Sequence, residues 1–324
     1  MVRRIGALIV LALAAVGVVR LGGVIVGSDK TTEASSPDTT LAPASAGATD
    51  PSDPGTVTDE PDVTGETDVT DVTDVTVSDS AAPTAEAGPS GPPSAADPAV
   101  VLIAGDSDAG TFGPYLESLL GDTGVVHTQL DYKVSSGLSR PDFFDWPAHF
   151  RETVPAVNPD IVVVTFGGND PQGLTTVEGS TPDHPNFIVS QPTGEPGGDV
   201  EWRAEYGRRV GEVMDFLAAD GRTVVWVGIP NDDNPDVTAR LAVQNEVVQG
   251  EAAKRPGVVF IDTWKRFSGR QGNWAEFVID PRDGQGKDVR ADDGFHLNET
   301  GAEILALDIA DAVKAALRAR GAAI

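Results

Sequence analysis

The chain has 324 residues, no cysteine and a formal net charge of −27, with 50 acidic and 23 basic side chains. A chain without cysteine has no disulfide framework, no lipid-modified cysteine anchor and no thiolate chemistry. The acidic surplus repels phosphate backbones and anionic headgroups, so it argues against nucleic acid as a partner and favours neutral or cationic ligands.

The amino-terminal segment has the pattern of an export signal. Arg3 and Arg4 form a basic cytoplasmic tail of residues 1–4, and residues 5–27 are apolar apart from Arg20. That length is sufficient to span a bilayer if Arg20 extends toward the outer headgroups. Apolar character resumes after Arg20 without a small-residue cleavage motif. We therefore expect an uncleaved transmembrane signal anchor with the rest of the chain outside the cell membrane; the alternative is a cleaved signal peptide and a secreted protein.

Residues 28–98 have the composition of a disordered, acidic linker. Residues 31–98 contain 14 acidic side chains and no Lys or Arg among Thr, Ser, Pro, Ala and Gly, and the tripeptide DVT recurs from Asp62, Asp68, Asp71 and Asp74. Too few large apolar side chains are present to offset the entropy lost on ordering. An extended tether is expected; a calcium-binding role is disfavoured because the repeat lacks the Gly-rich turns and mixed oxygen donors of calcium loops.

Residues 99–324 have the pattern of one folded domain, itself acidic with 35 acidic and 19 basic side chains. Continuous apolar runs of this kind are typical of strands buried on both faces, and they occur at residues 100–104, 161–166, 223–229 and 257–262. Helix-like segments alternate with them at residues 111–120, 202–219, 237–254 and 299–320. This alternation predicts a three-layer α/β/α fold with a parallel sheet.

Two further segments give local predictions. Thr300 followed by Glu303 reads as a capping box, which places the start of the last helix just after His296. Residues 171–200 are too long for a tight connection and too rich in Gly and Pro for a helix. Long loops of this kind are lids or substrate walls, with disorder as the alternative.

A serine follows the first apolar run, where ligands of parallel sheets bind. Gly105 permits a tight turn, and Ser107 then lies near the amino end of a helix, where the dipole and unpaired N–H groups stabilise negative charge. Ser107 is either a nucleophile or an ordinary helix cap, and Asp106 fits the cap equally well. The nucleophile requires partners.

His296 is the best candidate base among the four histidines. His127, His149 and His184 lie in segments that favour surface or packing roles, whereas Asp293 precedes His296 by three residues on a short loop. One turn then presents both side chains to one point, and Asp293 can orient the imidazole for proton transfer from Ser107. The alternatives are an Asx turn beside a surface histidine, or a metal bound by Asp292, Asp293 and His296, which is disfavoured because no second histidine lies at ligand spacing. No cofactor is expected.

Acyl transfer also requires donors for a developing oxyanion. Asn169, after the second run, can supply a side-chain amide, and Gly137 and Ser107 can supply backbone N–H groups; the alternative for Gly137 and Asn169 is an ordinary turn. The neighbouring acids Asp108, Asp170 and Asp292 are candidate substrate contacts.

This set of motifs resembles the SGNH, or GDSL-like, hydrolase superfamily. Ser107 in GDS, Gly137, Asn169 in GGND, and Asp293 with His296 in DGFH occur in the order that names it, and the resemblance covers residues 99–319. It implies a flavodoxin-like α/β/α fold, Ser107 as nucleophile, His296 as base, Asp293 as its orienting acid, and an oxyanion hole of Ser107, Gly137 and Asn169. One departure stands out: Asp108 replaces the leucine that usually follows the serine.

Anchor, tether and motifs together predict an extracytoplasmic serine esterase or O-acyltransferase that moves small, acetyl-like acyl groups on cell-envelope glycans. An integral membrane acyltransferase is the partner that the resemblance suggests for a transferase. The rival hypothesis is a catalytically silent glycan-binding or scaffold module, for which Asp108 is the best argument. A lipase is disfavoured because residues 171–200 are largely polar.

Overall fold

The computed structural model describes residues 91–324. The expected transmembrane anchor and the expected linker up to residue 90 lie outside the described residues. None of the helices within 91–324 combines the length and the apolar composition needed to cross a membrane.

Five parallel strands form the central sheet in the order β2-β1-β3-β6-β7. They are β1 Ala99–Gly105, β2 Val126–Tyr132, β3 Ile161–Thr165, β6 Thr223–Val227 and β7 Val258–Ile261. The four apolar runs are therefore confirmed as strands. The additional strand β2 lies at an edge and alternates in exposure, so it gives no continuous apolar signal.

Helices α1 to α4 connect these strands as crossovers, as the alternation predicted, and α5 and α6 follow the last strand of the sheet. They are α1 Ser107–Gly121, α2 Trp146–Val157, α3 Val200–Leu217, α4 Pro235–Ala252, the short α5 Thr263–Arg266 and α6 Glu299–Ala319, with a 3-10 turn at Ala219–Gly221. Helix α2 was not predicted, and its sequence contains two prolines, Pro147 and Pro155. Pro147 is tolerated in the first turn, where Asp145 caps the helix by accepting a hydrogen bond from the Ala148 N–H.

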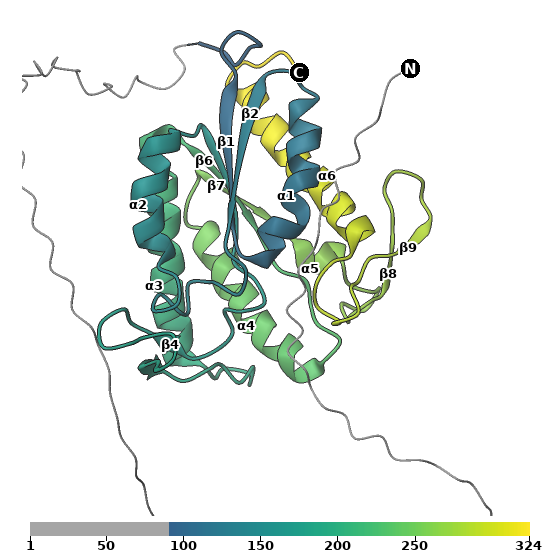
Figure 1. Ribbon diagram of the computed structural model, residues 1–324. Helices are drawn as coiled ribbons and strands as arrows, with labels where there is room; N and C mark the ends of the chain where they lie inside the picture. The colour runs from purple at the N-terminus through teal and green to yellow at the C-terminus, as the bar shows by residue number, and fades with distance from the viewer. Residues whose placement is uncertain (1–90) are drawn as a thin grey trace, which may run out of the picture. The chain divides into compact units, whose positions relative to one another are not determined.

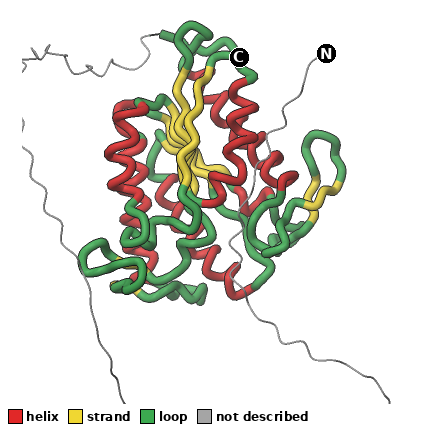
Figure 2. The backbone as a smooth tube through the Cα atoms, viewed as in Figure 1, coloured by secondary structure: helices red, strands yellow, loops and turns green. Residues whose placement is uncertain are grey.

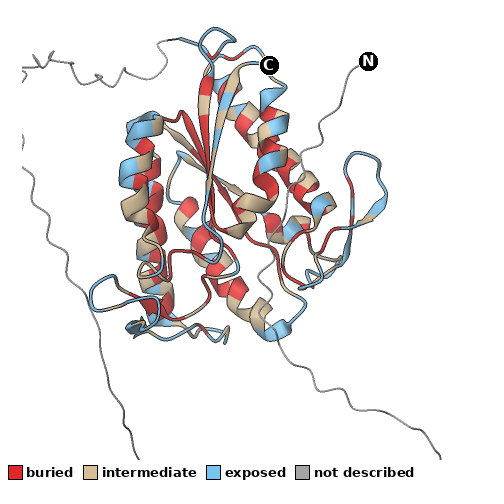
Figure 3. Ribbon diagram, in the orientation of Figure 1, coloured by how far each residue is buried: buried red, intermediate tan, exposed pale blue. Residues whose placement is uncertain are grey.

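The helices cover the two faces of the sheet in separate layers (Figures 1 and 2). Val101 and Ile103 of β1 point into one hydrophobic cluster with α1 and α6. Leu102 and Ala104 of the same strand point into the other cluster, with α2, α3 and α4. Figure 3 shows the buried sheet between the half-buried helices. Both clusters are formed by residues of the described range, which therefore has a hydrophobic core of its own, as a folding unit requires.

The predicted capping box is wrong in its residues, although α6 starts where expected. The helix begins at Glu299, and Asn298 Oδ1 accepts a hydrogen bond from the Gly301 N–H. Thr300 therefore lies inside the first turn. Glu303 accepts a hydrogen bond from the Arg282 guanidinium at 2.6 Å instead of returning to the helix start.

The long segment 171–200 contains an antiparallel hairpin of β4 Leu174–Thr175 and β5 Phe187–Val189. Trp202 Nε1 donates to the Gln172 carbonyl, and the Asp199 carboxylate accepts from the Thr193 and Gly194 amides. These contacts hold both ends of the segment on the domain, so it is ordered structure. A second hairpin, β8 Phe277–Ile279 with β9 Gly286–Asp288, precedes the segment that carries His296.

The turn out of β1 requires glycine. Gly105 has a φ of +146°, and a Cβ there would lie 2.1 Å from the Thr165 carbonyl oxygen of β3. Both the backbone conformation and the close approach of the two strands therefore exclude a side chain.

We expect Gly105→Ala to lower the free energy of unfolding by at least about 2 kcal/mol, because the clash is with backbone that cannot move aside. Gly121→Ala is the matched control, since a Cβ at Gly121 meets nothing within 4 Å. It should leave stability unchanged or raise it by about 0.5–1 kcal/mol. Urea unfolding of residues 91–324 measures both; equal effects of the two substitutions would contradict the close approach.

Candidate active site

The carboxyl ends of β1 and β3 bring the serine and the GGND turn together. Asp106, fully buried, is the N-cap of α1: its Oδ1 accepts from the Asp108 N–H, and its Oδ2 accepts from the Gly167 N–H at 2.7 Å. The cap is thus Asp106 and not Ser107. The serine hydroxyl is left available for another partner.

That partner is His296, which arrives from the loop before α6. Ser107 Oγ lies 3.0 Å from His296 Nε2, and His296 Nδ1 lies 2.6 Å from Asp293 Oδ2. The His296 side chain is about one third exposed, so it is accessible to a substrate. Serine, imidazole and carboxylate form one continuous hydrogen-bonded series, which is the arrangement that proton relay in acyl transfer requires.

The loop that carries the histidine is rigidly held. Asp293 Oδ1 accepts from the backbone N–H groups of Phe295 and His296, and the hydrogen bonds to His296 help to hold the pKa of this carboxyl below its ordinary value, against its partial burial. The Phe295 ring lies against Gly168, where a Cβ would be 2.6 Å from the ring. The second glycine of GGND therefore makes room for the aromatic residue of DGFH.

Arg290 and Trp274 support this loop, and the sequence analysis missed both. The Arg290 guanidinium is buried and donates to the carbonyls of Phe295, Asn231, Phe267 and Ala275. Burial lowers its pKa to about 10, so it remains charged at neutral pH. Trp274 Nε1 donates to the Gly294 carbonyl at 2.7 Å. In the sequence, the only indication of this role is that Arg290 lies three residues before Asp293, close enough to contact the histidine loop.

Asp170 is not a substrate contact, contrary to the expectation from its position. It is 1% exposed. Its carboxylate accepts from the Leu138 and Ser139 N–H groups and from the Tyr206 hydroxyl. Burial raises its pKa, and these three hydrogen bonds oppose that rise. Asp170 therefore fixes the loop that carries Gly137 to the turn that carries Asn169.

Gly137 and Asn169 lie on the two segments that Asp170 joins. A Cβ on Gly137 would be 2.0 Å from Asp170 Oδ1, so only glycine permits this approach. Asn169 is half-buried and directly precedes Asp170. No hydrogen bond joins either residue to Ser107 within residues 91–324; the two are linked to it through Asp170, the GGND turn and Asp106.

Asp108 is half-buried beside the nucleophile. Its Oδ2 is buried without a hydrogen-bond partner in the described part of the chain and lies against Gly167, where a Cβ would be 2.1 Å from it. Burial raises its pKa, Asp293 adds to that rise, and His296 and Arg290 oppose it. One oxygen of the residue that replaces the usual leucine is thus directed into the fold, against the GGND turn.

The other acidic residues near the site lie at its rim, whereas His149 lies elsewhere and has a packing role. Asp292 is exposed, and Asp233 lies against Gly294 beside the histidine loop, so the rim of the site is acidic. His149 pairs with Asp131 at 2.7 Å and packs on Trp146, which is a packing role. Within residues 91–324, no group of three or more acidic or histidine side chains is arranged to hold a metal ion.

We expect Asp170→Asn to lower the free energy of unfolding by about 2–4 kcal/mol, because the amide cannot accept from all three donors. If Gly137 is the oxyanion donor expected from the sequence, its displacement should also lower kcat for an ester by roughly 10²-fold, the effect of losing one such donor. Asp183→Asn, on the exposed part of the hairpin, is the control. Unchanged stability and kcat in Asp170→Asn would contradict the role given to this carboxylate.

We expect Asp108→Leu to raise the free energy of unfolding by about 1–3 kcal/mol at neutral pH, because a carboxyl whose Oδ2 is buried without a partner is replaced by an apolar side chain. The pKa of Asp108 is raised in the folded state. The free energy of unfolding of the native protein therefore falls as the pH rises above 3.8, the ordinary pKa of the carboxyl. The gain should therefore be larger at about pH 8 than at about pH 5.

Asp108→Asn removes the charge of the side chain but keeps its shape. If Asp108→Asn and Asp108→Leu both remove the pH dependence of the free energy of unfolding, that dependence comes from the charge of the carboxyl. If Asp108→Leu lowers the free energy of unfolding at both pH values, the carboxyl makes favourable interactions in the native protein and the prediction is contradicted.

Comparison with known proteins gives a family and a set of distant structural relatives. The family model described as "Protein of unknown function (DUF459)" matches residues 100–312. No curated protein matches the chain. Among solved structures, the lipase/acylhydrolase from Enterococcus faecalis is similar at 18% identity, over 67% of this chain and 96% of that one, with a TM-score of 0.45.

Two further structures have comparable similarity. A putative SGNH hydrolase from Slackia heliotrinireducens is 17% identical over 67% of this chain and 99% of its own, with a TM-score of 0.40. A carbohydrate esterase family 3 protein from Talaromyces cellulolyticus is 16% identical over 68% and 98%, with a TM-score of 0.44. By the match over residues 100–312, the chain belongs to the DUF459 family.

Proposed function

We propose that the protein is a serine esterase or O-acyltransferase that acts through an acyl-enzyme at Ser107. The observation that carries this proposal is the series of two hydrogen bonds, 3.0 Å from Ser107 Oγ to His296 Nε2 and 2.6 Å from His296 Nδ1 to Asp293 Oδ2. A serine that only capped its helix would not need this series, and Asp106 already provides the cap.

In the proposed reaction, Ser107 Oγ attacks the ester carbonyl while His296 Nε2 takes the hydroxyl proton. Asp293 holds the Nδ1 proton and stabilises the imidazolium. The tetrahedral oxyanion is stabilised by the Ser107 and Gly137 N–H groups and the Asn169 amide. Collapse of this intermediate expels the alcohol, which takes the proton from His296 and leaves an acyl-serine. Water or a sugar hydroxyl then accepts the acyl group by the reverse proton transfers.

The proposed substrates are small, acetyl-like esters of cell-envelope glycans, outside the cell membrane. Support for the location comes from the basic and apolar amino-terminal sequence and the acidic linker. Support for a neutral or cationic substrate comes from the acidic rim around Asp292, Asp293 and Asp233, which repels anionic groups. An integral membrane acyltransferase is the partner proposed for a transferase reaction.

The rival hypothesis of a catalytically silent module loses its main argument. It rested on a carboxylate at Asp108 that would obstruct the nucleophile. The Asp108 Oδ2 atom is buried against Gly167, and Ser107 keeps its hydrogen bond to His296. The catalytic proposal is therefore preferred.

We expect Ser107→Ala to lower turnover of p-nitrophenyl acetate by roughly 10³-fold or more, because the nucleophile is removed. Asp293→Asn should lower it by roughly 10²- to 10⁴-fold, because the imidazole loses its orienting acceptor. His149→Gln breaks the other His–Asp pair and should leave turnover within about twofold. Circular dichroism checks that each variant is folded, and unchanged turnover in Ser107→Ala would refute the assignment.

The acceptor and the acyl group need a separate measurement. We expect the wild-type protein to release acetate from O-acetylated cell-wall glycan, or to move the acetyl group to an unacetylated glycan when one is supplied. Turnover confined to p-nitrophenyl acetate would contradict the glycan proposal and leave the assignment of Ser107 intact.

A further inference from the structure

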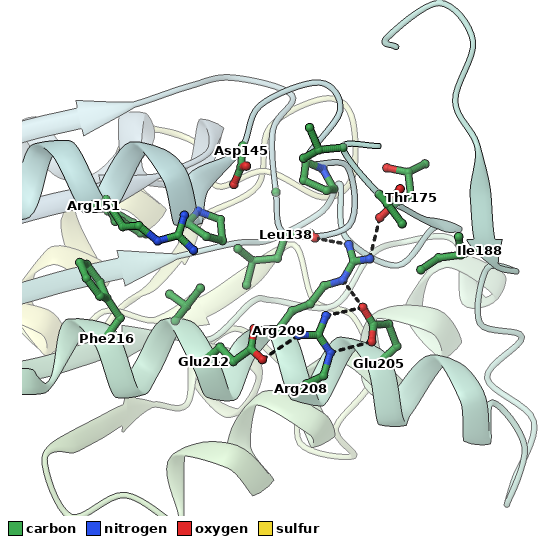
Figure 4. Close-up of a pocket in the computed structure, with 17 residues that line it drawn as sticks. Leu138, Asp145, Arg151, Thr175, Ile188, Glu205, Arg208, Arg209, Glu212 and Phe216 are labelled. Carbon is green, nitrogen blue, oxygen red and sulfur yellow. Dashed lines mark hydrogen bonds and ion pairs between the residues drawn. The ribbon is translucent and has the colours of Figure 1, made fainter. Parts of the chain in front are cut away.

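A cleft separates α2 from α3 on the same face of the sheet. Its volume is about 490 Å³, within the range of small-molecule sites. Figure 4 shows the cleft, with Leu138 and Phe216 among the side chains that line it. Its accessible apolar surface comes from the half-buried Pro147 and Phe216, whereas Leu138, Phe150 and Val213 are buried beneath it. The two helices are neighbours that leave this space open where packed helices would fill it.

The β4–β5 hairpin adds an apolar rim at one end. Val177 and Ile188 line the cleft, and they are 56% and 49% exposed. The sequence of residues 171–200 is largely polar, yet folding directs these two apolar side chains to the same rim. Exposed apolar residues that gather at the mouth of a cleft are typical of a ligand site.

The charged residues of the cleft other than Asp145 and Arg151 satisfy one another, and Asp145 accepts a hydrogen bond from the Ala148 N–H at the start of α2. Arg208 pairs with Glu205 and Glu212. Arg209 donates to Glu205 and to the carbonyls of Leu138 and Thr175. These groups therefore offer little hydrogen-bonding capacity to a ligand, and the matching surface of a ligand is apolar.

Arg151 is the exception. Within residues 91–324 it makes no ion pair, and it is exposed beside Phe216 at the end of the cleft opposite Ile188 (Figure 4). An apolar channel with one available cation at its end is complementary to a chain with an anionic head.

The cleft is distinct from the proposed catalytic site but shares a wall with it. Its lining includes Gly137 and Leu138 but not Ser107, Asn169 or His296. The Leu138 N–H donates to Asp170, whereas the Leu138 carbonyl accepts from Arg209, which lines the cleft. Asp170 thus binds the amide groups of this loop, and Arg209 in the cleft binds the carbonyl groups of the same loop.

We propose that this cleft binds a single-chain amphiphile with an anionic head, the chemistry of a free fatty acid. The alkyl chain lies over the half-buried Pro147 and Phe216 toward Ile188, and the carboxylate pairs with Arg151. The site is separate from that of the ester, and its occupant contacts the loop of Gly137 from behind.

The binding test uses residues 91–324 carrying Ser107→Ala, so that it does not depend on turnover. Titration calorimetry with decanoate should give a Kd of about 10–100 μM, which is about −5 to −7 kcal/mol. Val213→Trp fills the cleft and should weaken binding at least tenfold. Ile188→Asp, at an exposed position that tolerates a charge, should do the same and serves if Val213→Trp fails to fold. Ile279→Trp, on the exposed hairpin β8–β9, is the control and should bind as the parent does.

Two further experiments test whether Arg151 binds the carboxylate of the ligand and whether the ligand binds away from the ester site. Arg151→Gln should weaken decanoate binding several-fold and leave decanol binding unchanged. In the wild-type protein, decanoate should leave the KM for p-nitrophenyl acetate unchanged, because the sites are separate. The proposal is overturned if decanoate does not bind, if the cleft variants bind it as the parent does, or if decanoate competes with the ester. Failure of the ester assay alone would reject the proposed function and leave the binding result standing.

Discussion

A buried carboxylate, Asp106, joins the two strand ends on which the candidate site depends. It is fully buried and accepts from the Asp108 N–H at the start of α1 and from the Gly167 N–H after β3. Burial, with the neighbouring Asp108 charge, raises its pKa well above the ordinary value, and the two amide hydrogen bonds oppose that rise. Because Asp106 occupies the cap position, the adjacent Ser107 hydroxyl is available to His296. The cap and the nucleophile are therefore neighbouring residues with different tasks.

Three close approaches then bring distant segments to this point, and each requires a residue without a side chain. Gly105 lets β1 approach β3, Gly168 accepts the Phe295 ring of the histidine loop, and Gly137 accepts the Asp170 carboxylate. Buried polar groups hold the segments once they have met. Arg290 donates to a backbone carbonyl of the histidine loop, and Asp170 accepts from a backbone N–H of the Gly137 loop. The site is preorganised by buried side chains that bind backbone groups of the segments around it.

The sequence predicts the sheet and the reacting residues because both leave local signals. The strands β1, β3, β6 and β7 are continuous apolar runs, and Ser107 and His296 stand in short motifs at strand ends. Side-chain direction leaves no such signal. From their positions, Asp108 and Asp170 were expected to contact the substrate. Only the tertiary structure shows that Asp170 is buried and that Asp108 Oδ2 lies against Gly167. Likewise Thr300 and Glu303 fit a capping box, but Asn298 and Arg282 are better placed to complete those hydrogen bonds.

The cleft between α2 and α3 could not be predicted for the same reason, since Arg151, Val213 and Ile188 come from three separate segments. The central claim concerns Ser107, and covalent chemistry tests it most directly. Residues 91–324 are treated with a fluorophosphonate probe, and the modified residue is located by peptide mass spectrometry. The account predicts one adduct, on Ser107, that is lost in His296→Ala while the fold is retained. Absence of labelling, or labelling at another serine, would contradict it.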